Sequence, residues 1–282
     1  MVGAFFLKQP LLLFTHTHTH MITLKKYCLL LLLLLAITRQ VQAQFKQLVW
    51  SDEFNYLGLP DNTKWSYDTG GHGWGNNELQ YYTAARAENA RVENGHLIIE
   101  ARKEDHLGVH FTSARLVSKN KGDWKYGRIE VSAKLPKGKG IWPAIWMLPT
   151  KWVYGGWPKS GEIDIMEYVG YLPDSVYASV HTGAYNHAIG TNKTNGVLRK
   201  DLSDTFHVYA IEWTADKINF FIDEELYHTF DNDKNGSDAW PFDQEFHLLL
   251  NIAVGGNWGG KMGIDETVFP QRLEIDYVRV YQ

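Results

Sequence analysis

The chain has one cysteine in 282 residues, Cys28, and therefore no second thiol with which to close an intramolecular disulfide. Small exported domains often depend on disulfides because their hydrophobic cores are too small to hold the fold. Any fold of this chain must instead rest on core packing and backbone hydrogen bonding.

An excess of basic residues is also missing, since 28 lysines and arginines stand against 32 aspartates and glutamates, for a formal net charge of −4. Proteins that bind nucleic acid or anionic membranes use clustered positive charge. The balance therefore argues against both partners, and mildly against a highly sulfated polysaccharide.

The leucine-rich run at residues 27–37 is too short for a comfortable membrane span. It follows two lysines and precedes Val41-Gln42-Ala43, a small-residue cleavage pattern, which is the order typical of a secretory signal peptide. We therefore expect residues 1–43 to be a signal peptide, with synthesis starting at Met21. Cleavage after Ala43 would give a secreted or periplasmic protein without membrane attachment.

Loss of this leader would remove four basic residues and no acid, so the formal net charge would move from −4 to −8. Cys28 would leave with it. His16, His18 and His20 alternate with threonine, a hint of metal binding by composition alone, and we expect them to precede the start of synthesis. The remaining chain of about 240 residues fits one large β domain.

Strand patterns dominate residues 44–282. Residues 127–135 alternate apolar and polar side chains, and residues 246–254 are apolar on both faces, as in the centre of a sandwich. Similar strand patterns occupy residues 97–102, 176–182, 217–223 and 273–281. No long amphipathic helix, internal repeat or linker is visible, so we expect a single all-β sandwich.

Three carboxylates, Glu162, Asp164 and Glu167, lie in the otherwise apolar stretch 160–169. A strand with a strict period of two would put the first two on one face and the third on the other. A β-bulge near Ile165–Met166 would return Glu167 to the shared face. The two glutamates would then lie roughly 13 Å apart at Cα, and their side chains could close to about 5–6 Å, the carboxyl spacing of retaining glycosidases.

Two other interpretations of this cluster stay open: a solvated acidic strand face, or carboxylates that hold a cation. Crowding three negative charges on one partly buried face raises the pKa of at least one of them. A carboxyl with a raised pKa suits a general acid that works near neutral pH.

The sequence Glu-Ile-Asp-Ile-Met-Glu resembles the bulged Glu-x-Asp-x-x-Glu signature of glycoside hydrolase family 16, on its laminarinase (endo-1,3-β-glucanase) branch. The resemblance covers residues 48–281, with further landmarks at residues 48–54, 73–82, 113–116, 140–147, 251–258 and 276–281. It implies a β-jelly-roll sandwich of two antiparallel sheets with a concave substrate cleft, formed by a catalytic domain over residues 44–282.

The resemblance also implies a double-displacement mechanism in which Glu162 is the nucleophile and Glu167 the general acid and base. Asp164 would hydrogen-bond the nucleophile. Spacing alone would allow the two glutamates to exchange roles. The expected activity is hydrolysis of internal bonds in β-1,3-glucans such as laminarin, with retention of anomeric configuration.

Candidate sugar-binding residues flank this motif. Trp142 and Trp146 share a strand face with the small Ala144 between them, which leaves room for pyranose rings against the indoles, although core packing is the alternative for either. Arg115 offers a fixed fork of donors that suits sugar hydroxyls or the catalytic carboxylates, unless it is a surface charge. Asn251 lies in an apolar run and needs a hydrogen-bond partner there, from core backbone or from the sugar.

Three more candidates lie in loops or on the next strand. The resemblance makes Asn77 a sugar hydrogen-bonder, although asparagine in a glycine-rich loop is often only a turn residue. His181, on the strand after the acids, would position the acid or the substrate, unless its role is structural. Trp258, between glycines, would be an exposed platform at the cleft edge.

We expect no cofactor for catalysis. The resemblance places a structural calcium away from the cleft, held by Glu53, the carbonyl of Gly95 and Asp276, which offer oxygen ligands of the kind calcium prefers. The expected partner is the polysaccharide substrate, and the protein is expected to be a monomer.

Other activities stay open on the same sequence. Mixed-linkage β-1,3-1,4-glucan is a second substrate, and transglycosylation would use the same residues. Agar and carrageenan enzymes of the family usually depart from the segments at residues 73–82 and 140–147. A non-catalytic β-glucan recognition module would characteristically lack one or both catalytic glutamates, whereas Glu162 and Glu167 are both present.

Overall fold

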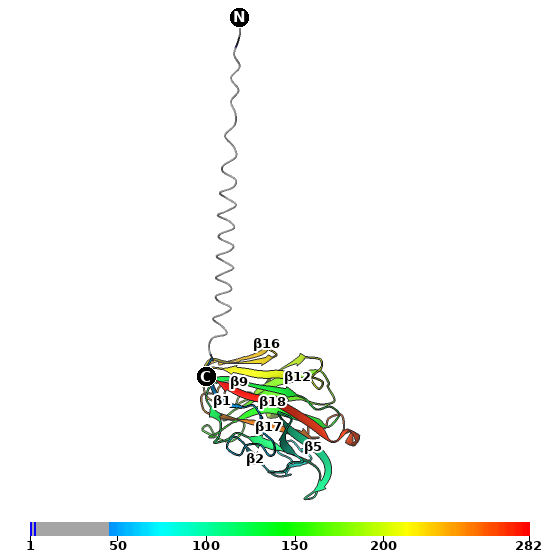
Figure 1. Cartoon of the computed structure of the whole chain (residues 1–282). Coiled ribbons are helices and arrows are strands. Elements are labelled where there is room, and N and C mark those ends of the chain that lie inside the picture. Colours follow the sequence, from blue (N-terminus) through cyan, green and yellow to red (C-terminus); the bar gives the residue numbers. More distant parts are fainter. Residues whose placement is uncertain (2, 4–44) are drawn as a thin grey trace. The chain divides into compact units, whose positions relative to one another are not determined.

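The computed structural model of the protein describes residues 1, 3 and 45–282. Residues 47–282 form one unit of packed strands, shown in Figure 1. The expected signal peptide therefore lies outside the described residues, apart from Met1 and Gly3. In the described part of the chain, no helix combines the length and the apolar character needed to cross a membrane.

Two sheets make up residues 47–282, and the chain passes between them repeatedly. The first contains, in spatial order, β16 (Glu225–Asp231), β15 (Lys217–Ile222), β14 (His207–Trp213), β9 (Gly127–Lys134), β18 (Gln271–Tyr281), β5 (His96–His106), β6 (Val109–Ser113) and β3 (Gln80–Tyr82), with β1 (Leu48–Asp52) paired to β18 and β4 (Ala90–Glu93) paired to β5. The second contains β13 (Lys193–Leu198), β12 (Ser175–His181), β11 (Glu162–Tyr168), β10 (Ile141–Pro149), β17 (Phe246–Val254), β7 (Arg115–Val117) and β2 (Ser66–Asp68), with β8 (Asp123–Trp124) paired to β17. Two short 3-10 helices, η1 (His187–Ile189) and η2 (Glu266–Val268), lie in loops.

This arrangement confirms the all-β sandwich expected from the sequence. The described strand pairs are antiparallel, except that β3 pairs with β6 in parallel. The chain enters β3 from β2 of the other sheet through residues 69–79. Because no tight hairpin joins β3 to its partner, turn geometry does not impose the antiparallel direction.

Residues with apolar side chains on the inner faces of both sheets form the core. On β9, Ile129, Val131 and Ala133 have no exposed surface, as their alternation in the sequence predicts. Every residue of β17 is buried, and β17 lies inside its sheet between β10 and β7. β10 lies between β17 and β11, the strand that carries the three acids. The packing of β17 in the core therefore supports β11 through β10.

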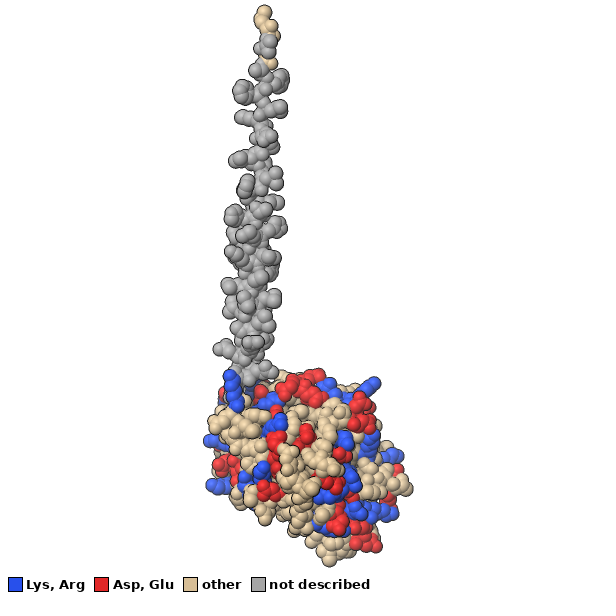
Figure 2. Space-filling view, viewed as in Figure 1, with Lys and Arg blue, Asp and Glu red and all other residues tan. Residues whose placement is uncertain are grey.

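Charges of both signs are interspersed over the face of the molecule that Figure 2 shows, so oppositely charged side chains can form local ion pairs.

One network of ion pairs is centred on a buried acid. Glu100 of β5 is only 1% exposed. Its carboxylate accepts hydrogen bonds from Arg91 Nη2 at 3.1 Å, from Arg272 Nε at 2.8 Å and from Arg102 Nη1.

Replacing Glu100 with alanine is expected to lower the free energy of unfolding by about 3 kcal/mol, because three guanidinium groups lose a buried acceptor. For a unit of this size the melting temperature should fall by roughly 6–12 °C. Thermal unfolding followed by circular dichroism measures the change. Glu93→Ala, which removes a more exposed partner of Arg91, serves as the control and should cost no more than about 1 kcal/mol. Equal losses in the two variants would contradict a special role for the buried acid.

Candidate active site

β11 carries the three acids and departs from a regular ladder. Against β12, Asp164 pairs with Ser179 and Glu167 pairs with Tyr177, so three residue steps on β11 face two on β12. Against β10 the register shifts at the same place. The bulge expected near Ile165–Met166 is therefore confirmed.

The bulge sorts the side chains of β11 onto two sides. Ile163, Ile165 and Met166 have no exposed surface and join the core. The three acids line a cleft of about 400 Å³. The rest of the lining comprises His72, Trp74, Gly75, Asn76, Glu78, Tyr82, Arg115, Trp142, Ala144, Trp146, Leu148, Trp152, Trp157, His187, Asn251 and Ala253.

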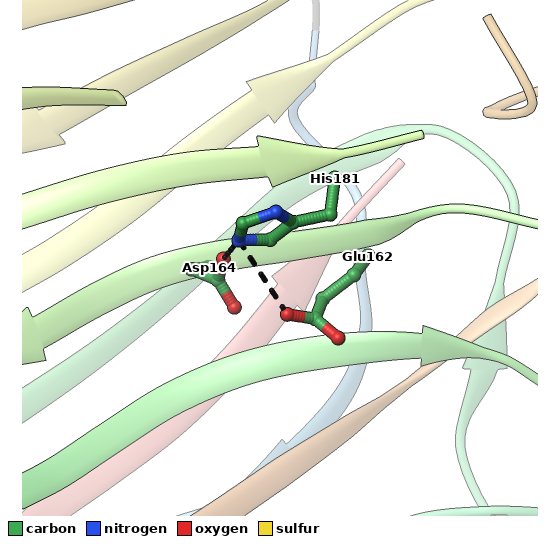
Figure 3. A group of neighbouring side chains, drawn as sticks. All are labelled: Glu162, Asp164 and His181. Carbon is green, nitrogen blue, oxygen red and sulfur yellow. Dashed lines mark ion pairs between the residues drawn. The ribbon is translucent and has the colours of Figure 1, made fainter. Parts of the chain in front are cut away.

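His181 of β12 lies beside two of the acids, as Figure 3 shows. Its Nε2 is 3.3 Å from Asp164 Oδ2 and 3.8 Å from Glu162 Oε1, and the histidine is buried beside the cleft without being part of its lining. The other oxygen of Glu162, Oε2, accepts a hydrogen bond of 2.9 Å from Trp157 Nε1. The two oxygens of Glu162 therefore have different neighbours, an imidazole and an indole.

Burial raises the pKa of all three carboxyls on β11. For Glu162 it does so to about 8, with repulsion from Asp164 adding to the effect and nearby His181 opposing it. Burial also raises the pKa of Glu167 well above its usual range, with the charges of Asp164 and Glu162 adding to the effect and nearby His181 opposing it. Burial likewise raises the pKa of Asp164. Because each negative charge disfavours the next, the three acids do not all ionise together near neutral pH, and the cleft wall can hold a carboxylate beside a carboxylic acid.

Trp142 of β10 is hydrogen-bonded to Glu167. Its Nε1 donates a hydrogen bond of 3.1 Å to Glu167 Oε1, an interaction that favours the ionised form and opposes part of the rise in pKa. The predicted sugar-binding indole therefore also contacts a catalytic candidate directly.

Arg115 of β7 is held between two indoles of the cleft wall. Its guanidinium carbon is 4.8 Å from the ring centroid of Trp74 and 4.6 Å from that of Trp146, and its Nε is 3.1 Å from Asp68 Oδ2. These two cation–π contacts restrain the guanidinium next to both rings. Trp146 is fixed further, because its Nε1 donates to Asn251 Oδ1 at 2.7 Å.

Asn251 of β17 finds its partners among side chains. Besides accepting from Trp146, it donates from Nδ2 to the hydroxyl of Tyr82 at 3.0 Å. Four predicted sugar-binding residues thus line one cleft together: Arg115, Trp142, Trp146 and Asn251.

Two other predicted sugar-binding residues lie outside the cleft lining. Asn77 is exposed and donates from Nδ2 to Asn257 Oδ1 at 2.8 Å, whereas its neighbour Asn76 lines the cleft. Trp258 is half-buried and packs edge-to-face against Trp142, with ring centroids 5.6 Å apart. Neither residue lines the cleft, although Trp258 contacts Trp142, which does.

Comparison with known proteins decides the family. Residues 77–279 match the family model for glycosyl hydrolases family 16. The chain belongs to glycosyl hydrolase family 16. The match includes the whole of β11 and every residue that lines the cleft except His72, Trp74, Gly75 and Asn76.

Individual proteins are similar over nearly all the described chain. A β-glucanase from Rhodothermus marinus is 56% identical over 255 residues, covering 88% of this chain and 89% of that protein. The X-ray structure of the laminarinase from Rhodothermus marinus has a TM-score of 0.83 at 57% identity, covering 84% of this chain and 97% of the other. The crystal structure of a non-specific endo-β-1,3(4)-glucanase of the family has a TM-score of 0.80 at 49% identity, covering 84% and 91%. The fold is therefore the jelly roll of a glycoside hydrolase.

Sequence reasoning missed several cleft residues of this family 16 enzyme. Trp157 and His187 come from the loops on either side of β11 and β12, and their rings lie 5.0 Å apart. Glu78 is largely buried, accepts a hydrogen bond of 2.7 Å from Gln80, and has a pKa raised by burial. Glu78 lies inside the landmark at residues 73–82, which could have drawn attention to it. No periodic pattern marks Trp157 or His187, because neither belongs to a strand.

The residues predicted to hold calcium meet other partners. Both carboxylate oxygens of Glu53 accept hydrogen bonds from Arg279, at 3.0 and 2.7 Å. Asp276 Oδ1 lies 3.8 Å from His96 Nε2, and Gly95 lies in the turn between β4 and β5 with φ of 80°. The oxygen donors suit calcium, but a cation at Glu53 would have to share its carboxylate with a guanidinium. In this arrangement the residues fit the ion poorly.

The hydrogen bond from Trp142 predicts a shift in the pH dependence of hydrolysis. Trp142→Phe removes a donor that favours ionised Glu167, so the pKa of Glu167 should rise and the fall in kcat/KM on the alkaline side should move to higher pH. Trp146→Phe is the matched control, because its indole donates to Asn251, which does not titrate. A profile of kcat/KM against pH for both variants makes the measurement. An alkaline limb at the same pH in Trp142→Phe and wild type would contradict the proposed coupling.

Proposed function

We propose that the protein is an endo-acting β-1,3-glucanase that hydrolyses laminarin-type glucans with retention of anomeric configuration. The observation that carries the proposal is the bulged strand β11, which puts Glu162, Asp164 and Glu167 on one cleft wall, where burial raises the pKa of all three. The similarity to the Rhodothermus marinus laminarinase supports the substrate class.

In the first step, the ionised carboxylate of Glu162 attacks the anomeric carbon of the sugar on the non-reducing side of the bond. Glu167 gives its proton to the departing glycosidic oxygen as that bond breaks. In the second step, Glu167, now ionised, takes a proton from water, which attacks the same carbon and releases Glu162. Two inversions at one carbon give net retention.

Asp164 and His181 act on the first step through Glu162. Burial raises the pKa of Asp164, so Asp164 can keep its proton and donate it in a hydrogen bond to the Glu162 carboxylate, while His181 Nε2 lies within 4 Å of both acids. The Trp157 indole fixes the direction of the attacking carboxylate. Trp142 and Trp146 offer indole faces for the C–H faces of glucose rings.

Mixed-linkage β-1,3-1,4-glucan is the second candidate substrate. The observation that favours it is the 49% identity to a non-specific endo-β-1,3(4)-glucanase whose chain this protein covers to 91%. Transglycosylation would use the same two steps with a sugar hydroxyl in place of water. A recognition module without activity is disfavoured because both glutamates are present and both face the cleft.

Product analysis on laminarin, barley β-glucan, agarose and carrageenan tests the proposal, with Glu162→Gln beside the wild-type protein. We expect short 1,3-linked oligosaccharides from laminarin, and their loss in the variant. Laminarin binding without products from any glycan would overturn the proposal in favour of a recognition module. If barley glucan gave products at the same rate as laminarin, the mixed-linkage activity would be favoured instead.

Export and oligomeric state are part of the same proposal. The signal peptide at residues 1–43 would deliver a monomer to the periplasm or the medium, with Gln44 as its first residue. Amino-terminal sequencing of the exported protein and its mass by light scattering test both points. A first residue before Gln44, or a dimer mass, would contradict them.

A weak structural calcium at Glu53, Gly95 and Asp276 is a further proposal, drawn from the family resemblance. Because Arg279 competes for the Glu53 carboxylate, we expect calcium to raise the melting temperature only slightly over a chelator. Arg279→Gln frees that carboxylate, so the calcium-dependent rise should become larger in this variant. Melting temperatures with excess calcium and with EDTA make the measurement, and no dependence on calcium in either protein would count against the site.

A further inference from the structure

The cluster of Glu162, Asp164 and His181 has the spacing of a metal site. One donor atom from each residue lies within 4.8 Å of the other two. His181 Nε2 is 3.3 Å from Asp164 Oδ2, which matches the separation of about 3.3 Å between two ligands of a tetrahedral ion with bonds of about 2.0 Å. Figure 3 shows the three side chains converging on one point.

A separate observation concerns the hydrogen bonding of the Asp164 carboxylate. Asp164 is 3% exposed, and its Oδ2 is buried without a hydrogen-bond donor. A buried carboxylate oxygen without a donor is unfavourable, and such atoms are uncommon in folded proteins. The unpartnered oxygen is the one that faces His181.

We propose that Glu162, Asp164 and His181 bind a divalent transition-metal ion, with zinc the best fit, and that the bound ion reversibly blocks hydrolysis. One imidazole nitrogen and two carboxylate oxygens form a ligand set that zinc accepts. Calcium and magnesium prefer more oxygen ligands and bind imidazole poorly. The fourth position of the ion would face the cleft, because Glu162 and Asp164 both line it.

The two oxygens of Glu162 explain how the ion would fit. Oε2 accepts the hydrogen bond from Trp157, which leaves Oε1, on the side of His181, for the metal. The Oε1–Nε2 distance of 3.8 Å would need to shorten by about half an ångström to reach the tetrahedral spacing. An ion bound there withdraws the lone pairs of Glu162 from the anomeric carbon, so zinc and substrate would exclude each other. This consequence for activity rests on the proposed function.

Metal binding is tested first without any activity measurement. Cobalt(II) added to the full chain should give the visible absorption of a four-coordinate ion, and zinc should raise the melting temperature. His181→Gln should shift the zinc midpoint to at least about tenfold higher concentration. His187→Gln is the matched control, since its ring lies 5.0 Å from that of His181 and it supplies no ligand. The histidines at positions 16, 18 and 20 are common to all variants, so they cancel in the comparison.

Asp164→Asn is a second ligand variant in case His181→Gln does not fold. An unchanged zinc midpoint in the folded ligand variant, or no cobalt spectrum in the wild-type protein, would overturn the proposal. A midpoint that shifts equally in His187→Gln would also overturn it, because the effect would then not come from the ligands.

Inhibition kinetics complete the test. With laminarin as substrate, zinc should raise KM without changing kcat, EDTA should reverse the effect, and calcium or magnesium at the same concentration should have none. Hydrolysis that is indifferent to zinc would sink the metal site and leave the proposed function intact. A His181-dependent cobalt spectrum in a protein that hydrolyses no glycan would sink the proposed function and leave the metal site intact.

Discussion

Glu162→Ala is expected to lower kcat on laminarin by about 10⁴-fold or more, because no other carboxylate is then placed to form the glycosyl–enzyme bond. The loss should persist with an aryl β-laminaribioside that carries a good leaving group, since such a leaving group replaces only the acid. Steady-state kinetics on both substrates makes the measurement. Unchanged binding of laminari-oligosaccharides would show that the variant is folded.

Added azide then identifies the role of Glu162 by the product it gives. Truncation to alanine opens a space on the α face of the sugar, where azide can attack directly, so part of the activity on the aryl glycoside returns and the product is the α-glycosyl azide. Glu162→Gln keeps that space filled with an amide and should not be rescued. A β-glycosyl azide from Glu162→Ala would mean that the two glutamates have the opposite roles, which their spacing alone permits.

The bulge in β11 could be predicted because a regular strand with this sequence would turn one of the three acids towards the core. Three acids cannot join a core, yet a regular strand would send Glu167 to the side of Ile163 and Ile165. One extra residue resolves this, and the structure has the register shift there. β17 could be predicted for a similar reason, since residues 246–254 are apolar on both faces and only a central strand buries both.

The edge strand β13 could not be predicted from the alternation of apolar and polar residues. Its sequence, Lys-Thr-Asn-Gly-Val-Leu, has no alternation of apolar and polar residues, and most of it is exposed. It is a strand because β12 offers it an open edge, with Ser175 opposite Leu198 and Val180 opposite Lys193. Backbone pairing to the preceding strand, across the loop at residues 182–192, leaves no mark in the sequence of β13 itself.

The loop residues of the cleft could not be placed for a related reason. Asn76 lines the cleft and Asn77 does not, because the backbone of Asn77 adopts φ of 56° and turns its side chain towards Asn257. Sequence spacing shows which face a side chain occupies only where the backbone conformation is regular, as in a strand.

The Glu53–Arg279 pair could not be predicted from the sequence either, since it joins residues on β18 and just after β1 that only the sheet brings together.

Glu167→Ala should lower kcat on laminarin by about 10²–10⁴-fold, the usual contribution of a general acid and base. On an aryl laminaribioside with a good leaving group, the first step needs no proton and should stay fast, whereas water attack on the glycosyl–enzyme should be slow. We therefore expect a burst of released phenolate followed by a slow steady state. Azide, which needs no base, should attack the intermediate from the β face and give the β-glycosyl azide. An α-glycosyl azide from this variant would assign the nucleophile to Glu167.

The pH profile distinguishes Glu167 from Glu78, an acid of the cleft that does not belong to β11. In the wild-type protein, kcat/KM should fall as pH rises through the pKa of Glu167, because only the protonated acid donates to the leaving oxygen, and burial places that pKa above its ordinary range. This alkaline limb should disappear in Glu167→Ala on the activated substrate. Glu78 also has a pKa raised by burial, but Gln80 and Asn76 donate hydrogen bonds to it in the cleft wall, so Glu78→Gln should keep the limb. If Glu78→Gln removed the limb and Glu167→Ala did not, the proton that reaches the leaving oxygen would come from the loop before β3, and the bulge in β11 would need another explanation.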